Sequence, residues 1–390
     1  YHITLYILNT KIYVRKGDFM KNKYAILVLS IFVFSLPIAT LAYSLMWERS
    51  YDGGKNDFAN SVVCDFQDNP IVTGATYIKS WDYVTIKYDR NGNVVWQNIE
   101  SEDGTQQAND VTVDKQNNVI VTGISNGRYY TVKYNSEGKK LWAEKFNMGG
   151  NDSGEGVATD SKGNVIVTGH SYIDNQFDVY TVKYDKNGIM VWKILYQDDH
   201  DDYAYDIAID SFDNIVIGGM TMGRSRADTT NSFMILKYDK DGNLLWRQQF
   251  DDSQAHGMGI AIDFENNVII TGYFHNGNNF DFKTLKYDKD GKLLWRKTYD
   301  AGKDDKAYAV AVDKKDNIAV TGSSYKGNAL YFDYLTVVYD KNGKQIWEQR
   351  QAIGEDDQAN GIAFDSRGNI VVTGSTRLKS WEFYTAKYKT

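Results

Sequence analysis

The sequence predicts an all-β fold, a single seven-bladed β-propeller with four antiparallel strands in each blade. The first observation is a set of seven tryptophans that recur at intervals of 46 to 54 residues, which are Trp47, Trp96, Trp142, Trp192, Trp246, Trp295 and Trp347. Periods of this length are typical of solenoids and propellers. The second is composition, because 33 Gly, 29 Tyr and 9 Trp in 390 residues suit tight turns and pleated strands.

Each repeat contains four short strand-like pieces, which we call A, B, C and D. In the fourth repeat they are Tyr205–Asp210, Asn214–Gly219, Phe233–Tyr238 and Leu244–Gln249. An Asx-rich turn joins A to B and a Gly-containing turn joins C to D, both of which are tight hairpin connections. Four short antiparallel strands in about 50 residues indicate a propeller blade rather than a helical solenoid.

The order of the strands at the two ends of the chain predicts how the ring closes. The first predicted strand, around Trp47, is of type D, and the last, ending at Tyr388, is of type C. We therefore expect the N-terminal strand to pair with the C-terminal blade and complete it. This pairing would remove the free sheet edge that otherwise promotes aggregation.

The N-terminal segment has the pattern of an export signal. Met20 is followed by two lysines and then by an apolar run that ends at Ala42 after small residues, as in a secretory signal peptide. An uncleaved membrane anchor is the alternative, but the polar sequence that follows favours cleavage and a secreted or periplasmic protein without a stable anchor. The predicted divisions are residues 1–19, translated upstream sequence; 20–42, signal peptide; and 43–390, propeller.

Charge and cysteine content limit the possible partners. The formal net charge is −7 and becomes more negative when residues 1–42 are removed, which argues against a nucleic-acid partner. A single cysteine, Cys64, allows no intramolecular disulfide. It takes the place of an aliphatic residue in an A strand, so we expect it to fill the core.

The repeats resemble a known family. Segments such as AYDIAIDSFDNIVIGG and ANGIAFDSRGNIVVTGST are similar to those of the bacterial SBBP proteins, which are seven-bladed β-propeller repeats. The resemblance covers residues 45–390. It implies the propeller fold and a scaffold without an assigned reaction, so function has to be argued from the site.

The spacing of the repeats separates a constant face from a variable face. The A–B and C–D turns have the same length throughout, whereas the B–C connection varies widely. We call the face formed by the A–B and C–D turns the constant face, and the face formed by the B–C loops and D–A connections the variable face. Loops of varied length on a rigid scaffold commonly bind ligands, so the variable face is the candidate site of an exported binding or scaffold propeller for a glycan or an extracellular or envelope protein.

Aromatic and acidic residues are frequent in the connections of the variable face. Two loops, Lys79–Tyr83 and Lys379–Phe383, nearly match and belong to blades that ring closure makes neighbours. Their tryptophans can stack on sugar rings, or alternatively pack between the blades. The candidate ligand-binding residues are Trp81, Trp381, Lys79, Lys379, Asp82, Glu382, Tyr77, Tyr172, Tyr273 and Tyr325.

The D–A connections supply many aspartates, among them Asp57, Asp305 and Asp357. One group is a candidate calcium site, because clustered carboxylates hold hard cations, although exposed acidic loops are more often simply solvated. The predicted fold requires no cofactor, and calcium is the one metal ion that we consider as a ligand. The calcium candidates are Asp198, Asp199, Asp201 and Asp202.

Two alternatives to a binding function remain open. One is an extracellular polysaccharide hydrolase or lyase that uses carboxylates of the variable face as acid and base. Catalysis predicts a close carboxylate pair in a pocket, one of the pair with a raised pKa, whereas binding predicts exposed aromatics without such a pair. The other is a surface protein that assembles through its outer strands.

One further pattern is the same in nearly every repeat. An Asp ends each A strand and a Lys lies near the end of most C strands, as in Asp65 and Lys87, but Val338 interrupts the lysine series. Because the pattern repeats, we interpret it as architectural, forming ion pairs or capping turns.

Overall fold

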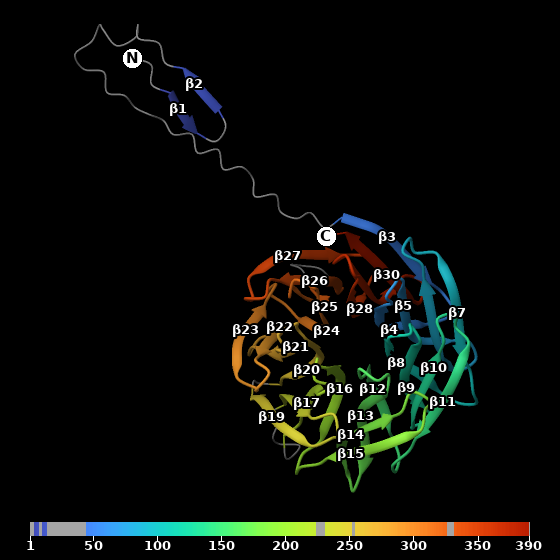
Figure 1. Ribbon diagram of the computed structural model, residues 1–390. Coiled ribbons are helices and arrows are strands. Elements are labelled where there is room, and N and C mark those ends of the chain that lie inside the picture. Colours follow the sequence, from blue (N-terminus) through green and yellow to red (C-terminus); the bar gives the residue numbers. More distant parts are fainter. Residues whose placement is uncertain are drawn as a thin grey trace, which may run out of the picture. The chain divides into compact units, whose positions relative to one another are not determined.

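A computed structural model describes residues 4–7, 10–13, 44–223, 231–251, 254–325 and 331–389. Residues 41–390 form one compact unit, in which seven four-stranded antiparallel sheets surround a central axis (Figure 1). The predicted seven-bladed propeller is therefore confirmed. The described residues form strands and turns, and no helix among them is suited to crossing a membrane.

The N-terminal residues form a separate unit. Strand β1 (Thr4–Ile7) pairs antiparallel with β2 (Thr10–Tyr13). The predicted signal peptide, residues 20–42, lies outside the described residues.

Each blade runs from an inner strand at the axis to an outer strand at the rim. Blade 1 consists of β4 (Asp57–Cys64), β5 (Pro70–Tyr77), β6 (Trp81–Tyr88) and β7 (Val94–Glu100). Blade 2 consists of β8 (Gln106–Val113), β9 (Val119–Ser125), β10 (Tyr129–Tyr134) and β11 (Lys140–Phe146). Blade 3 consists of β12 (Ser153–Thr159), β13 (Val165–Ile173), β14 (Gln176–Tyr184) and β15 (Met190–Tyr196). Blade 4 consists of β16 (Asp202–Ile209), β17 (Ile215–Thr221), β18 (Ser232–Tyr238) and β19 (Leu244–Asp251). Blade 5 consists of β20 (His256–Ile262), β21 (Val268–His275), β22 (Phe280–Tyr287) and β23 (Leu293–Tyr299). Blade 6 consists of β24 (Asp305–Val312), β25 (Ile318–Ser324), β26 (Asp333–Tyr339) and β27 (Gln345–Gln351). Blade 7 consists of β28 (Asp357–Phe364), β29 (Ile370–Arg377), β30 (Trp381–Lys389) and β3 (Ser44–Tyr51).

Ring closure occurs as the sequence predicts. Strand β3 pairs antiparallel with β30 and forms the rim of blade 7, with Trp47 opposite Lys387 (Figure 1). The two ends of the propeller are thus joined by backbone hydrogen bonds rather than by a covalent link.

The hydrophobic core lies between adjacent blades. Tyr83 of blade 1, for example, packs with Val111 and Tyr130 of blade 2, and its hydroxyl donates a hydrogen bond to the Tyr130 carbonyl at 2.9 Å. Seven such interfaces repeat around the ring. Since each blade buries its faces against two neighbours, an intact ring is needed to bury the whole core.

The repeated Asp and Lys form buried ion pairs next to the constant face. The Nζ–Oδ2 distance is 2.8 Å between Lys387 and Asp365, and five other blades have an equivalent pair at 2.7 to 2.9 Å. In blade 6, Val338 stands where the lysine would be. Burial alone raises the pKa of Asp365, but hydrogen bonds from Lys387 and Asn369 outweigh it and lower the pKa below its ordinary value. The predicted structural ion pairs are confirmed.

The same layer links each blade to the next. The Lys186 carbonyl, in a C–D turn of blade 3, accepts hydrogen bonds from Trp142 Nε1 at 3.1 Å and from Lys133 Nζ at 3.4 Å, both of blade 2. Trp47, Trp96, Trp246 and Trp295 donate in the same way to the following blade. The recurrent tryptophans therefore serve as inter-blade contacts.

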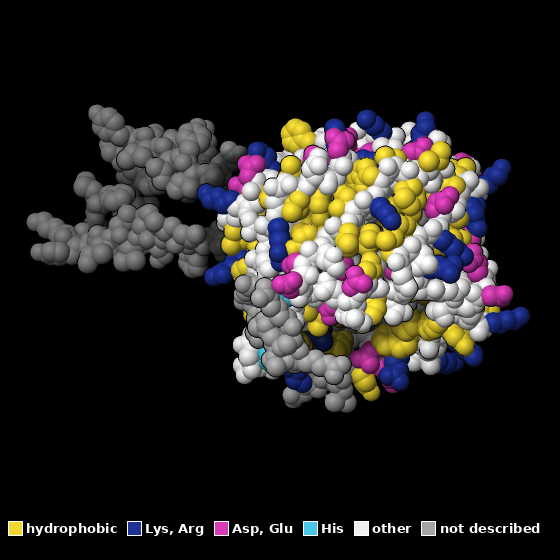
Figure 2. Space-filling model, turned by 90° about the horizontal axis from the view of Figure 1, so that it is seen from below, with side chains coloured by type: hydrophobic (Ala, Val, Ile, Leu, Met, Phe, Trp, Pro, Cys, Tyr) yellow, Lys and Arg dark blue, Asp and Glu magenta, His cyan; other side chains and the backbone are white. Residues whose placement is uncertain are grey.

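The outer strands begin with exposed apolar side chains. Val94 of β7 and Leu245 of β19 are 58% and 52% exposed. A bulge at this position, where Tyr88 opposes Val94 and Lys87 opposes Trp96, accounts for the exposure in blade 1. Figure 2, a side view, shows apolar side chains interspersed with Lys and Arg over the wall of the propeller. Assembly through the outer strands stays a prediction.

Candidate functional site

The two matching tryptophans lie on either side of one phenylalanine. The ring centroid of Phe58, in β4, is 5.5 Å from that of Trp81 in blade 1 and 5.6 Å from that of Trp381 in blade 7. Tyr77 packs edge-on against Trp81 at 5.3 Å. All four rings are partly exposed. We call Phe58, Tyr77, Trp81 and Trp381 the aromatic seam, because they bridge the junction where the ring closes.

The polar candidates beside the aromatic seam differ in their access to solvent. Lys79 and Lys379 are exposed. Asp82 is only 2% exposed and accepts a hydrogen bond from Ser80 Oγ at 3.2 Å, so its carboxylate is engaged within the protein. Burial, with the nearby charges of Asp52 and Asp57, raises the pKa of Glu382.

The other predicted aromatics belong to separate clusters. Tyr172, in blade 3, packs against Phe177 at 5.0 Å, and Tyr325, in blade 6, packs against Phe332 at 3.9 Å. Tyr273 lies within strand β21 rather than in a loop and stacks on His256 at 4.8 Å. The structure does not bring these three tyrosines to the aromatic seam.

Several aspartates of the D–A connections are buried structural groups, so interpreting them as acids of the variable surface is wrong. Asp57, Asp305 and Asp357 are fully buried where an inner strand begins. The Oδ2 atom of Asp57 accepts a hydrogen bond from the Gly53 amide at 2.7 Å, and Asp357 accepts one from the Ile353 amide at 2.7 Å. Each carboxylate therefore closes the connection that precedes its strand.

The calcium candidates make different contacts. Asp198 accepts hydrogen bonds from His200 Nδ1 at 2.8 Å and Tyr196 OH at 3.2 Å, and it pairs with Arg247 at 3.2 Å. Asp201 accepts the Phe177 amide at 2.8 Å. Asp199 is exposed. Asp202 is fully buried, and its burial, with the charge of Asp198, raises its pKa to about 7.

A different acidic group is more compact. Among the described residues, Asp281, Asp300 and Asp305 are the three acids that each bring an oxygen atom within 4.8 Å of the others. Asp281 accepts a hydrogen bond from Asn276 Nδ2 at 2.8 Å, and Asp305 accepts one from the Ala301 amide at 2.6 Å. Internal donors already engage this group, which the sequence did not suggest as a calcium site.

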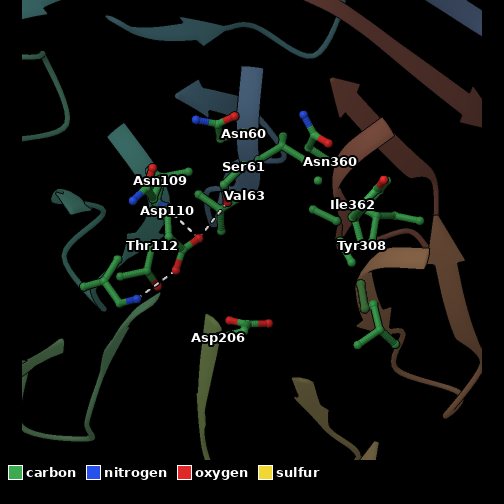
Figure 3. Close-up of a pocket in the computed structure, with 18 of the residues that line it drawn as sticks. Asn60, Ser61, Val63, Asn109, Asp110, Thr112, Asp206, Tyr308, Asn360 and Ile362 are labelled. Carbon is green, nitrogen blue, oxygen red and sulfur yellow. Dashed lines mark hydrogen bonds between the residues drawn. The ribbon is translucent and has the colours of Figure 1, made fainter. Parts of the chain in front are cut away.

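A cavity of about 370 Å³ follows the central axis (Figure 3). Every inner strand has a bulge near its variable-face end. The residues at the bulge, from blade 1 to blade 7, are Asn60, Asn109, Glu155, Tyr205, Met258, Tyr308 and Asn360. The next residues are Ser61, Asp110, Gly156, Asp206, Gly259, Ala309 and Gly361. We call the first set the bulge ring.

The asparagines of the bulge ring are structural. Asn60 Nδ2 donates to the Ala108 carbonyl at 2.7 Å, and Asn360 Nδ2 donates to the Ala59 carbonyl at 2.9 Å. Each joins its blade to the next. Blades 3 to 6 carry Glu, Tyr, Met and Tyr instead, so the channel has one amide-lined side and one acidic and aromatic side.

Three carboxyl groups on consecutive blades line the channel. Asp110 accepts hydrogen bonds from Ser61 Oγ at 2.7 Å and the Val157 amide at 2.8 Å, as Figure 3 shows. Asp206 accepts the Ile207 amide at 2.7 Å and the Ile260 amide at 2.8 Å. Desolvation raises the pKa of Asp110. Desolvation and the nearby charge of Asp110 raise the pKa of Asp206, and desolvation raises the pKa of Glu155 to about 7.

The channel has a signal in the sequence that loop lengths do not reveal. The bulge-ring residue stands five positions before the Asp that ends each A strand. Its identity changes from amide to acid to aromatic, whereas Ala or Gly stands directly before it in every blade. Variation in loop length pointed to the variable face instead, so the channel was not predicted.

The fold and the site define a seven-bladed β-propeller built from sequence repeats, with an axial cavity and an aromatic seam. Residues 346–377 match the family described as SBBP, the β-propeller repeat, which confirms the predicted resemblance. The matched unit begins in β27 and ends with β29, so the sequence repeat straddles two blades. The matched repeat begins with a D strand rather than an A strand, as the propeller itself does with β3.

Comparison with solved structures supports the fold alone. Sqt1 from Chaetomium thermophilum is similar with a TM-score of 0.50 and 10% identity, covering 90% of this chain and 100% of that one. A protein of unknown function from Bacteroides caccae has a TM-score of 0.47 and 10% identity, covering 76% and 94%. A gluconolactonase from Xanthomonas campestris has a TM-score of 0.44 and 13% identity, covering 90% and 93%. No curated protein matches the chain in sequence.

Proposed function

We propose that the protein is an exported, non-enzymatic binding propeller that recognises a glycan through the variable face. The observation that carries the proposal is the aromatic seam. Two tryptophans from adjacent blades flank Phe58 at nearly equal distances and remain partly exposed. Partly exposed, fixed aromatic rings with polar neighbours suit sugars, which present both apolar faces and hydroxyls.

The seam is preorganised. Asn56 Oδ1 accepts the Trp381 backbone amide at 3.3 Å across the blade junction. The exposed Lys79 and Lys379, which follow the same pattern in the two blades, can donate hydrogen bonds or pair with an acidic glycan. An extracellular or envelope protein is the alternative partner for the same surface. Export rests on the sequence of residues 20–42.

A glycan array probed with the full chain, with and without calcium, tests this function. Trp381→Ala and Trp81→Ala should lose at least tenfold in affinity while the melting temperature shows the fold retained. Phe280→Ala is the matched control, because Phe280 occupies the equivalent strand position in blade 5 and packs against His275 at 5.1 Å. Binding that survives in both Trp variants would contradict the proposal.

A polysaccharide hydrolase or lyase is the second candidate, and a specific observation favours it. Asp110 and Glu155 line one cavity on adjacent blades, and burial raises the pKa of Glu155 to about 7, which suits the acid of an acid and base pair. Release of reducing ends or unsaturated products from a polysaccharide panel, abolished in Glu155→Gln, would support this function. An inactive wild-type protein that binds glycans would leave the binding function.

A further inference from the structure

The acids of the channel differ in their partners from the aspartates near the constant face. Three carboxyl groups, Asp110, Glu155 and Asp206, face a cavity of about 370 Å³, and none of the described residues that line it is Lys or Arg. His170 Nδ1 lies 3.9 Å from Glu155, but burial lowers the pKa of this histidine to about 4, so it is neutral above that pH. Near the constant face of the same strands, six buried aspartates each have a lysine. Asp110, Glu155 and Asp206 are half-buried, so a ligand in the cavity can reach them, and the lining provides no Lys or Arg to pair with them.

Beside the acids, the channel is lined by aromatic and methionine side chains. Tyr205, Met258 and Tyr308 follow Glu155 around the bulge ring on blades 4 to 6. Tyr205 stacks on Tyr203 with an angle of 8° between their rings, and Tyr308 packs against Tyr273 at 6.1 Å. These contacts hold the two channel-lining rings in place. Aromatic faces and carboxylates together recognise organic cations.

The acids are close neighbours but unsuited to a single metal ion. A Cβ placed on Gly156, next to Glu155, would lie 3.0 Å from the Asp206 Cα, so blades 3 and 4 approach closely here. Each carboxylate oxygen of Asp206 accepts one backbone amide, which leaves each oxygen a lone pair for a further N–H donor. Moreover, among the described residues the three channel acids do not form a set with oxygens all within 4.8 Å. Tyrosine and methionine walls would also contribute little to a hard cation.

We propose that the channel binds a ligand through an organic ammonium group, which pairs with Glu155 and Asp206 and lies against Tyr205. Asn60 and Asn360 are engaged in joining the blades, and Asn109 Nδ2 donates to Glu155 Oε2 at 3.1 Å, so the ammonium has one preferred side of the channel. An amino sugar and a polyamine both supply this group. The site is distinct from the aromatic seam and does not depend on the function proposed for it.

Calorimetric titration of the full chain at pH 7, where the amine of glucosamine is mostly protonated, tests the proposal with two pairs of probes. Glucosamine is compared with N-acetylglucosamine, and cadaverine with 1,5-pentanediol, so that each ammonium compound has a neutral partner. We expect at least one ammonium probe to bind at least tenfold more tightly than its neutral partner. Preference for glucosamine would identify an amino sugar, and preference for cadaverine a polyamine.

Two variants locate the binding. Glu155→Gln should lower the affinity for the ammonium probe at least tenfold. Asp206→Asn is the second channel variant, for use if the first does not fold. Glu265→Gln, on an exposed A–B turn outside both the channel and the aromatic seam, should leave the affinity unchanged. The proposal is overturned if no ammonium probe binds, if the neutral partners bind equally, or if the folded channel variants bind as the wild type does.

Discussion

Carboxylates near the constant face and carboxylates in the channel belong to the same inner strands, and their surroundings differ. Near the constant face, an Asp pairs with a Lys in six blades, as Asp365 does with Lys387. At the bulge ring and the position after it, Glu155 and Asp206 have no Lys or Arg among the described residues that line their cavity. The pKa of Asp365 is lowered, whereas the pKa of Glu155 and that of Asp206 are raised. Burial acts in the same direction at both levels, so the presence of a cation decides the sign.

The comparison also distinguishes architecture from specialisation. The Asp–Lys pairs recur around the ring and connect to the turns that join blades, so they belong to the scaffold. The channel acids occupy only blades 2 to 4, at positions where other blades have Ser, Gly, Ala, Asn, Tyr or Met. Asp110 and Asp206 each accept an amide of the following blade, but the other blades pack without an acid at these positions. The ring therefore does not require the channel acids, which supports assigning them to a ligand.

The largest expected effect comes from removing a carboxylate from a buried pair. Asp365→Asn leaves Lys387, which is 1% exposed, without its partner, and we expect a loss of about 3–5 kcal/mol in the free energy of unfolding. Asp313→Asn in blade 6 is the matched control. Because Val338 stands opposite, that variant loses only hydrogen bonds in the turn and should cost about 1 kcal/mol. Urea unfolding of both proteins measures the difference, and equal losses would break the comparison.

Much of the scaffold was predictable because its determinants repeat. The strand order around Trp47 and Tyr388 predicted ring closure and, through it, that Trp81 and Trp381 belong to neighbouring blades. Phe58 between them was not predicted, because one phenylalanine at the start of an inner strand has no repeating signal.

Buried acids account for the main errors of prediction from the sequence. Asp57 and Asp305 precede a run of apolar residues and look like solvated loop acids, since Asp disfavours strands. Their strands in fact begin at these residues, and in blade 4 β16 begins at Asp202, three residues before the predicted start. The amides that satisfy the carboxylates belong to the preceding connection, a contact that residue types alone do not reveal.

A smaller effect is expected from neutralising the channel, and its sign depends on pH. The pKa of Glu155 is raised from 4.5 to about 7, so the folded protein holds a proton that the unfolded chain has lost between these values. Its contribution to stability therefore falls as pH rises through this window. Glu155→Gln removes the cost of holding an ionised carboxylate in the folded protein, and we expect this variant to be about 2–3 kcal/mol more stable than the wild type at pH 8.

Melting temperatures of the wild type and Glu155→Gln at pH 4 and pH 8 test this sign. The two proteins should be similar at pH 4 and separate by several degrees at pH 8. Glu265→Gln, on an exposed A–B turn, is the control for losing one negative charge. A variant less stable than the wild type at pH 8 would mean that Glu155 has a partner equivalent to the lysines of the constant face.

The smallest expected effect separates two classes of tryptophan. Trp142→Phe keeps an aromatic ring but loses the hydrogen bond from Nε1 to the Lys186 carbonyl. That carbonyl still accepts a hydrogen bond from Lys133 Nζ, so the variant should lose about 1 kcal/mol in the free energy of unfolding. Trp81→Phe also keeps its contact with Phe58, and the Trp81 indole makes no hydrogen bond to another described residue, so the melting temperature should hardly change. If Trp81→Phe nevertheless lost glycan binding, the seam tryptophan would contribute to recognition rather than to the scaffold; equal destabilisation of both variants would place it with the architectural set.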